Sequence, residues 1–195
     1  MNEAVPAGEG AMAAILGMQS DALKVVTDQV TSQGDVVQLA NLNCPGQIVI
    51  SGTKQGVEKA SLQAKEAGAK RAIPLVVSGP FHSELMRPAA SKLQQALNQL
   101  DMHNTDVPVI SNVTASPVTS AEEMKELLVQ QLYSPVRFEE SIRALMDLGV
   151  NTFIECGPGK VLSGLVKKID RSAVIYAAYD LESIEQVIEA SKEWA

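Results

Sequence analysis

The first residue whose type and position could support catalysis is a histidine in a predicted strand-to-helix turn. His82 lies in Ser78-Gly79-Pro80-Phe81-His82-Ser83, after an extended apolar segment and at the expected start of a helix. In α/β folds such turns expose side chains to a cleft. An imidazole titrates near neutrality, so it can take a proton from a hydroxyl and return it to a leaving group. Capping the helix, or packing against it, is the more common role, and the local sequence leaves both open.

A general base needs a nucleophile, and the usual serine arrangement is absent from this sequence. The Gly-x-Ser-x-Gly turn that presents a serine to a histidine occurs nowhere in the 195 residues. Cys156 is the alternative, because it precedes Gly157 at the end of a predicted strand, and a helix N-terminus stabilises a thiolate. A free cysteine is more often a small buried apolar residue.

Two further groups of residues could bind ligands. Gly157-Pro158-Gly159-Lys160 precedes a predicted helix and could offer amide donors to a phosphate, but it lacks the Walker A spacing, so a structural turn is favoured. Residues 54–71 contain five basic and two acidic residues, and residues 160–171 contain four and one, so each segment carries +3 in a chain of net charge −7. Such segments are either solvated helix faces or sites for an anionic partner.

The elements expected over residues 8–77 follow the order β-α-β-β-α-β. Strands are expected at residues 10–17, 36–42, 47–51 and 71–77. Ser20 and Asp21 offer an N-cap for the first helix, and Thr53 offers one for the second, with Val57, Ala60, Leu62 and Ala64 on its apolar side. Asn43-Cys44-Pro45-Gly46 is a turn signal between the two middle strands. This order is the ferredoxin-like pattern.

Residues 78–195 have a different organisation. Helices are expected at residues 83–100, 122–132, 138–148, 161–169 and 183–194, and strands at 107–111, 152–156 and 173–177. Strands that alternate with helices favour a parallel, covered sheet. Three strands make a thin sheet compared with the usual number, about five or six. The segment is therefore predicted to be the C-terminal part of a larger α/β subdomain.

Composition excludes several classes of protein. A content of 46% hydrophobic and 20% charged residues is typical of a globular domain. A content of two cysteines and two histidines argues against a zinc site and against a disulfide framework. The acidic balance argues against nucleic acid, and no apolar run has the length of a membrane span. Because the sequence after Met1 lacks a basic secretory signal, a cytoplasmic location is expected.

In series, these segments resemble the bacterial malonyl-CoA:acyl carrier protein transacylases, an acyltransferase family of fatty-acid biosynthesis. The resemblance extends along essentially the whole chain, with the motifs in the family's order. The matching stretches include Gly10-Ala11-Met12-Ala13-Ala14, Asn41-Leu42-Asn43-Cys44-Pro45-Gly46-Gln47, Ser78-Gly79-Pro80-Phe81-His82-Ser83, Val107-Pro108-Val109-Ile110-Ser111-Asn112, Gln131-Leu132-Tyr133-Ser134-Pro135-Val136 and Gly157-Pro158-Gly159-Lys160-Val161-Leu162.

The resemblance implies an α/β-hydrolase-like large subdomain with an inserted ferredoxin-like small subdomain. It also implies ping-pong catalysis, in which a serine takes malonyl from malonyl-CoA and passes it to the phosphopantetheine thiol of acyl carrier protein. His82 takes the base and acid role, and Gln131 supplies the oxygen that orients its ring. Phe81 corresponds to the form associated with malonyl, and Asn41 and Asn43 are expected to face the cleft. No cofactor or metal is implied, since the thioesters are substrates.

The sequence departs from the family in one respect. It begins downstream of the family's Gly-His-Ser-x-Gly turn and of the arginine that pairs with the malonyl carboxylate. We therefore expect the chain alone to be inactive, or to act with the missing segment supplied by another chain. Two other hypotheses stay open, namely a non-catalytic module that binds carrier protein or CoA, and an unrelated enzyme that uses Cys156.

Overall fold

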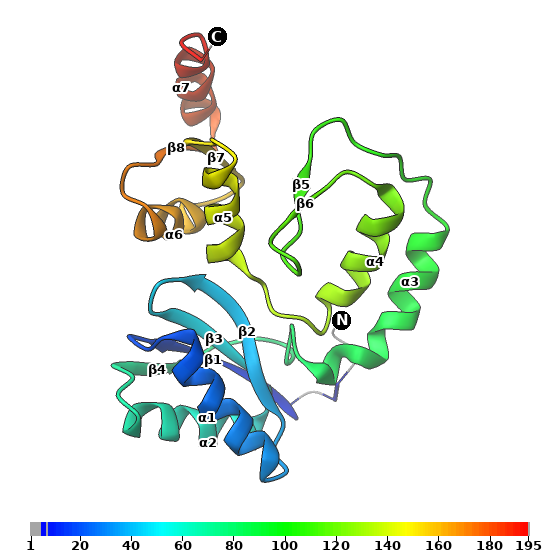
Figure 1. Ribbon diagram of the computed structural model, residues 1–195, viewed down its shortest axis with the longest axis vertical. Coiled ribbons are helices and arrows are strands. Elements are labelled where there is room, and N and C mark those ends of the chain that lie inside the picture. The colour runs from blue at the N-terminus through cyan, green and yellow to red at the C-terminus, as the bar shows by residue number, and fades with distance from the viewer. Residues whose placement is uncertain (1–4, 7, 195) are drawn as a thin grey trace. The chain divides into compact units, whose positions relative to one another are not determined.

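The computed structural model describes residues 5–6 and 8–194, which form two compact units (Figure 1). The first unit ends at Ser141 and the second begins at Ile142. The subdomain boundary predicted after residue 77 is not tested by this division and stays a prediction. The sequence at Met1 that bears on a secretory signal lies outside the described residues.

The first unit opens with a four-stranded antiparallel sheet in the order β2-β3-β1-β4. Helix α1 connects β1 to β2, and α2 connects β3 to β4, so the predicted β-α-β-β-α-β order is confirmed. The elements are β1 (Gly10–Leu16), α1 (Ser20–Ser32), β2 (Val37–Cys44), β3 (Gln47–Thr53), α2 (Lys54–Glu66) and β4 (Arg71–Pro74).

Alternation along the strands gives this sheet two different faces. One face packs on α1 and α2 and forms the main core, in which Ile15 and Ile50 are fully buried. The opposite face carries Met12, Ala40 and Val49, and a phenylalanine from a later segment, Phe81, packs against them. The list of core residues predicted for α2 was wrong at one position, because Leu62 is 61% exposed whereas Val57, Ala60 and Ala64 are buried.

Helix capping in this unit follows the sequence in one of two cases. The Thr53 hydroxyl accepts a hydrogen bond from the Gly56 amide at 3.0 Å, which confirms the predicted N-cap of α2. For α1 the N-cap residue is Gln19, whose side chain makes no capping hydrogen bond, so the prediction of a cap from Ser20 or Asp21 was wrong. Both of those residues lie inside the first turn of the helix, where the extended backbone of a cap residue is not available.

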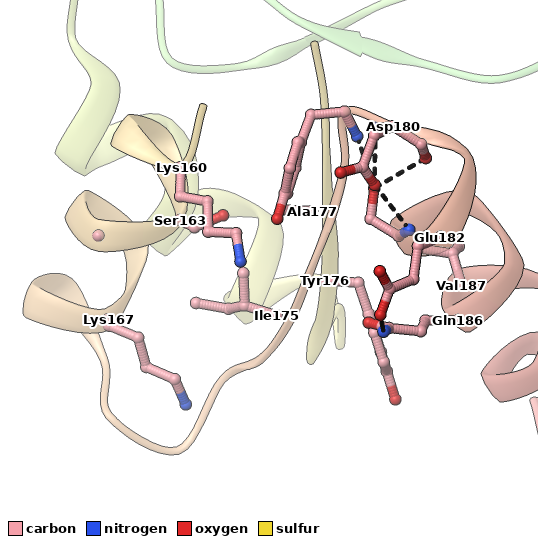
Figure 2. A pocket seen from close by; sticks show the side chains of 13 residues that line it. Lys160, Ser163, Lys167, Ile175, Tyr176, Ala177, Asp180, Glu182, Gln186 and Val187 are labelled. Atoms are coloured by element: carbon pink, nitrogen blue, oxygen red, sulfur yellow. Dashed lines mark hydrogen bonds between the residues drawn. The ribbon is translucent and has the colours of Figure 1, made fainter. Parts of the chain in front are cut away.

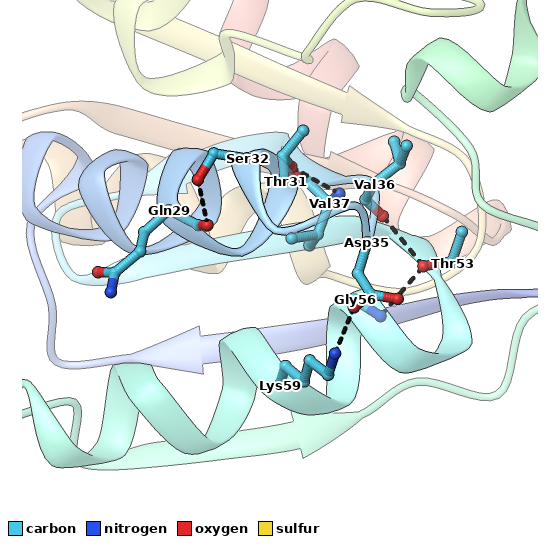
Figure 3. A network of polar contacts seen from close by, with 9 residues as sticks. All are labelled: Gln29, Thr31, Ser32, Asp35, Val36, Val37, Thr53, Gly56 and Lys59. Atoms are coloured by element: carbon cyan, nitrogen blue, oxygen red, sulfur yellow. Dashed lines mark hydrogen bonds and ion pairs between the residues drawn. The ribbon is translucent and has the colours of Figure 1, made fainter.

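A polar network joins the end of α1 and the ends of the two middle strands to the start of α2 (Figure 3). The Thr31 hydroxyl donates to the Val37 carbonyl at 2.8 Å and accepts from its amide at 3.0 Å. Lys59 of α2 forms an ion pair with Asp35 in the loop before β2. The backbone at Val36, just before β2, passes close to Gly52 of β3. Only glycine fits at position 52, because a Cβ there would lie 2.1 Å from the Val36 carbonyl oxygen.

The remainder of the first unit differs from the prediction in two places. The single helix expected at residues 83–100 is a 3₁₀ helix, η1 (Glu84–Ala89), followed by α3 (Ala90–Asn98). Pro88 has no amide hydrogen, so it cannot make the α-helical bond to the carbonyl four residues earlier. The strand expected at residues 107–111 shortens to β5 (Val109–Ile110), which pairs antiparallel with β6 (Pro117–Val118). Helix α4 (Ala121–Gln131) follows as predicted, and so does α5 (Phe138–Asp147), which begins in the first unit and continues into the second.

The second unit contains a two-stranded parallel sheet. Strands β7 (Thr152–Cys156) and β8 (Val174–Ala178) are joined through α6 (Val161–Ile169), and α7 (Leu181–Ser191) follows β8. The prediction of one parallel sheet with three strands was wrong, because β5 pairs with β6 through a tight loop closed by a bond from the Ser111 amide to the Ser116 carbonyl. In the described part of the chain, no helix combines the length and apolar character needed to cross a membrane.

Candidate active site

His82 and Gln131, which are 49 positions apart in the sequence, come together in the first unit. The Nδ1 atom of His82 lies 2.9 Å from the backbone carbonyl oxygen of Gln131, the last residue of α4. A carbonyl oxygen only accepts hydrogen bonds, so Nδ1 must carry the proton in the neutral ring. That tautomer leaves Nε2 with a free lone pair, which is the arrangement that a general base requires.

The oxygen that orients the ring belongs to the backbone of Gln131 rather than to its side chain. The side-chain Nε2 lies 3.4 Å from His82 Nδ1, but both atoms are donors in this tautomer, so the pair makes no hydrogen bond. The amide instead donates to the Ser134 carbonyl at 3.0 Å, in the turn that follows α4. The side chain of Gln131 thus stabilises the turn after α4, and the backbone carbonyl of Gln131 orients the imidazole of His82.

The turn that carries His82 is anchored at several points. The Ser83 hydroxyl is fully buried and donates to the Pro80 carbonyl at 2.7 Å. The Glu84 amide donates to the Gln38 side-chain oxygen of β2 at 3.0 Å. His82 itself has a φ of +59°, a left-handed conformation that side chains other than glycine rarely adopt. Strained backbone of this kind persists where the surroundings impose it, and it clusters at functional sites.

The segment after α4 also reaches strand β2, which carries the two predicted asparagines. The Val136 amide donates to the Ala40 carbonyl and the Leu42 amide donates to the Val136 carbonyl, both at 2.8 Å. Asn41 lies between these two bonds, and Asn43 lies two residues further along β2. Both side chains are partly exposed. The structure therefore brings Asn41 into the same part of the first unit as the segment that holds the His82 ring.

Arg87 is a contact at this site that sequence reasoning missed. Its guanidinium forms two hydrogen bonds with Glu84, at 2.6 and 2.7 Å, and lies 3.9 Å from the centre of the Tyr133 ring. The hydrogen bond from Arg87 lowers the pKa of the Glu84 carboxyl. The i,i+3 spacing of the pair was a visible signal, but the contact with Tyr133 was not. Arg87 thus connects the segment after His82 to the segment after Gln131.

A cavity of about 280 Å³ lies beside the end of α4. Gln131 and Asn112 supply polar groups at its wall, and most of the other side chains are apolar. His82 is not among the lining residues, so the cavity lies next to the site without opening onto the imidazole. Among the described residues, no cluster of three or more histidines, cysteines or acidic residues could hold a metal ion.

The first turn of α6, which follows the glycine-rich segment, binds the side chain of a glutamate from β7. Glu155 accepts from the Leu162 amide at 3.0 Å, and from the Ser163 amide and hydroxyl at 2.7 and 2.6 Å. Desolvation raises the pKa of Glu155, but these hydrogen bonds outweigh it, and the net shift is downward. The amides at the start of α6 are therefore occupied, which disfavours the phosphate-binding interpretation and leaves those donors unavailable to a Cys156 thiolate. Cys156 is exposed, and Cys44 is buried.

A second cavity, of about 590 Å³, lies between α6 and α7 in the second unit (Figure 2). Lys160 and Lys167 of the basic segment 160–171 line one wall, and Asp180 lies on the other side. Lys160 lies over the Tyr179 ring at 4.9 Å, and Lys167 donates to the carbonyls of Arg171 and Ala173. Both cations are thus engaged within the protein, and none of the predicted site residues lines this cavity.

Known proteins match this chain along almost its entire length. A model of the acyl transferase domain family matches residues 1–187. The malonyl CoA-acyl carrier protein transacylase of Bacillus subtilis (strain 168) is 67% identical over 193 residues, which cover 99% of this chain and 61% of that protein. An acyl-carrier-protein S-malonyltransferase from Burkholderia pseudomallei 1710b superimposes with a TM-score of 0.93 at 44% identity, covering 97% of this chain and 61% of that one.

A third match is a structure described as a type II PKS acyl-carrier protein in complex with its malonyl-transacylase. It superimposes with a TM-score of 0.93 at 42% identity, and covers 97% of this chain and 61% of that chain. The chain thus spans about three fifths of the length of the relatives that it matches, at 61% for each of these three.

Proposed function

Because the chain belongs to the acyl transferase domain family, we propose that His82 is the general base and acid in a transfer of malonyl from CoA to acyl carrier protein. The observation that carries the proposal is the 2.9 Å contact between His82 Nδ1 and the Gln131 carbonyl, which leaves Nε2 as the basic nitrogen. The names of the matching relatives support malonyl-CoA and acyl carrier protein as the two substrates. Such an enzyme would act in the cytoplasm.

In each half of the proposed reaction, His82 takes one proton from the attacking group and gives it to the leaving group. His82 Nε2 takes the proton of a serine hydroxyl as the oxygen attacks the malonyl thioester, and returns it to the CoA sulfur as that thiolate leaves. In the second half-reaction Nε2 takes the proton of the phosphopantetheine thiol as the sulfur attacks the malonyl ester, and returns it to the serine oxygen as that oxygen leaves. Gln131 stabilises the imidazolium in both halves, because its carbonyl oxygen faces the Nδ1–H.

These 195 residues contain no Gly-x-Ser-x-Gly turn that could supply the attacking serine hydroxyl. We therefore propose that further polypeptide supplies it, in the same chain or in another, within an α/β-hydrolase-like subdomain to which residues 78–195 contribute. Residues 8–77 form the ferredoxin-like small subdomain of that arrangement. The β2-β3-β1-β4 order supports this assignment, because it is the antiparallel order that a β-α-β-β-α-β chain adopts in the ferredoxin-like pattern.

Phe81, Asn41 and Asn43 are the proposed substrate contacts. Phe81 precedes His82 and packs on Met12, Ala40 and Val49, which holds its side chain against the sheet. Its proposed role is to limit the space for a bulky acyl group. The partly exposed amides of Asn41 and Asn43 offer both donors and acceptors to a polar substrate.

The proposal is tested by a single-turnover assay with labelled malonyl-CoA and acyl carrier protein. The 195-residue chain alone should transfer no label, and transfer should appear when a polypeptide that carries the family's Gly-His-Ser-x-Gly turn is added. His82→Ala should abolish that transfer, whereas His103→Ala should not, since the His103 side chain is 80% exposed beside Asp101. Transfer by the chain alone would contradict an external hydroxyl, and full transfer by His82→Ala would contradict the base role.

A second candidate function is binding of carrier protein without catalysis. The basic segment 54–71 favours it, because Lys54 and Lys65 line a largely apolar cavity of about 660 Å³ beside α2. A titration of labelled carrier protein at two salt concentrations should show weaker binding at high salt. The double variant Lys54→Gln, Lys65→Gln should weaken binding, and Lys24→Gln, in an exposed ion pair on α1, serves as the control. Binding that changes neither with salt concentration nor with these substitutions would show that the segment 54–71 does not bind carrier protein.

A further inference from the structure

A glycine at the start of β1 lies against the turn that carries His82. A Cβ at Gly10 would lie 2.3 Å from Cδ, 2.6 Å from Cγ and 2.9 Å from Cβ of Pro80. The φ of Gly10 is not positive, so its backbone conformation does not require glycine. A larger residue does not fit at this position because the proline ring lies so close. Pro80 is fully buried in this contact.

The two sides of the contact differ in how far they can yield. Gly10 is held by pairing with Thr53 of β3, and the adjacent residue Glu9 accepts a bond from the Lys54 amide at 2.9 Å. The Pro80 side consists of a turn outside any helix or strand. Extra volume at Gly10 would therefore displace Pro80 rather than the strand.

The displacement would be large enough to disturb the imidazole. Moving Pro80 Cδ from 2.3 Å to an ordinary contact of 3.4 Å requires a shift of about 1 Å. His82 follows only two residues later, in a left-handed conformation that leaves little freedom to compensate. Because its Nδ1 lies 2.9 Å from the Gln131 carbonyl, a shift of about 1 Å would break that hydrogen bond.

We propose that Gly10 is a positioning residue for His82, acting through the Pro80 ring to hold Nδ1–H against the Gln131 carbonyl. The inference rests on the proposed function of His82 as a base, since it fixes which ring nitrogen is free. It assigns a role at the site to a strand residue 72 positions earlier in the sequence. Gly10 touches no reacting atom in this scheme.

The tautomer of His82 gives a direct test, because the chain has only two histidines. Long-range proton–nitrogen correlation spectra of the ¹⁵N-histidine-labelled chain should show His82 as the neutral Nδ1–H form. Gly10→Ala should remove this preference and give the mixture typical of a solvated imidazole, whereas exposed His103 should be unchanged. Gly164→Ala is the matched control, since a Cβ there has nothing within 4 Å, and should leave both histidines unchanged.

A double variant separates positioning from loss of folding. Pro80→Ala removes the two atoms closest to the new methyl group and leaves only Cβ, at 2.9 Å, so the shift required falls from about 1 Å to about 0.5 Å. Gly10→Ala with Pro80→Ala should therefore regain more of the Nδ1–H form than Gly10→Ala alone, or regain folding if Gly10→Ala alone does not fold. The proposal is overturned if folded Gly10→Ala keeps the Nδ1–H form, or if the double variant is no better than Gly10→Ala. If the unmodified chain shows the Nδ1–H form but malonyl transfer survives His82→Ala, the proposed role of His82 as a base is contradicted, whereas the positioning of its ring by Gly10 is not.

Discussion

Replacing His82 by glycine and by alanine tests whether the left-handed backbone conformation at this position lowers the stability of the folded chain. With φ at +59°, both histidine and alanine adopt a left-handed conformation that costs about 1–2 kcal/mol, and glycine does not. Glycine loses about 0.5–1 kcal/mol in return, because its unfolded chain is more flexible. The His82→Gly variant should therefore be more stable than His82→Ala by about 0.5–1 kcal/mol.

The hydrogen bond to Gln131 sets the position of both variants relative to the unmodified chain. Both lose the Nδ1–H bond to the carbonyl, which has a net value of about 1 kcal/mol. His82→Ala should then be destabilised by about that amount, and His82→Gly should be close to the unmodified chain. For a chain of this size the two variants should differ in melting temperature by about 1–4 °C.

Thermal unfolding followed by circular dichroism would measure the difference, with two controls of opposite sign. Ala115, in the loop between β5 and β6, has a φ of +52°, so Ala115→Gly should stabilise the chain by about 0.5–1 kcal/mol. Ala96→Gly, inside helix α3, should destabilise it by about the same amount. If His82→Gly melts below His82→Ala while both controls behave as expected, the strain argument is refuted.

Three further predictions concern helices α2 and α6 and strand β7. Thr53→Ala should destabilise the chain by about 1 kcal/mol in chemical denaturation, through loss of the bond to the Gly56 amide, whereas Thr53→Ser should retain most of the stability. Gly164→Ala should raise stability by about 0.5–1 kcal/mol, because this position inside α6 has open space for a methyl group; a loss measured in the same way would indicate a hidden contact. Glu155, whose pKa is lowered from 4.5, should stabilise the folded state above that pH and lose its effect as the pH falls through the lowered pKa. The stability gap between the unmodified chain and Glu155→Gln should therefore close on acidification, and a gap independent of pH would contradict the assignment.

The sequence by itself determined the features that depend on neighbouring residues. Thr53 caps α2 through a residue three positions away, and Pro45 and Gly46 close the hairpin between β2 and β3. The apolar periodicities located most helices, and the series of motifs indicated the family that the later comparisons confirmed. For the cap, the hairpin and the helices the relevant interactions lie within a few residues, so local conformational preferences were sufficient.

Only the tertiary structure decided how the site is assembled. It selected the backbone oxygen of Gln131 rather than its side chain, placed Pro80 on Gly10, and directed Glu155 to the amides of α6. It also paired β5 with β6 instead of with the parallel strands. The His82–Gln131 and Gly10–Pro80 contacts join residues 49 and 70 positions apart, and the side chain of Glu155 could have bonded elsewhere. Such choices depend on the packing of whole elements against one another, which no local sequence pattern encodes.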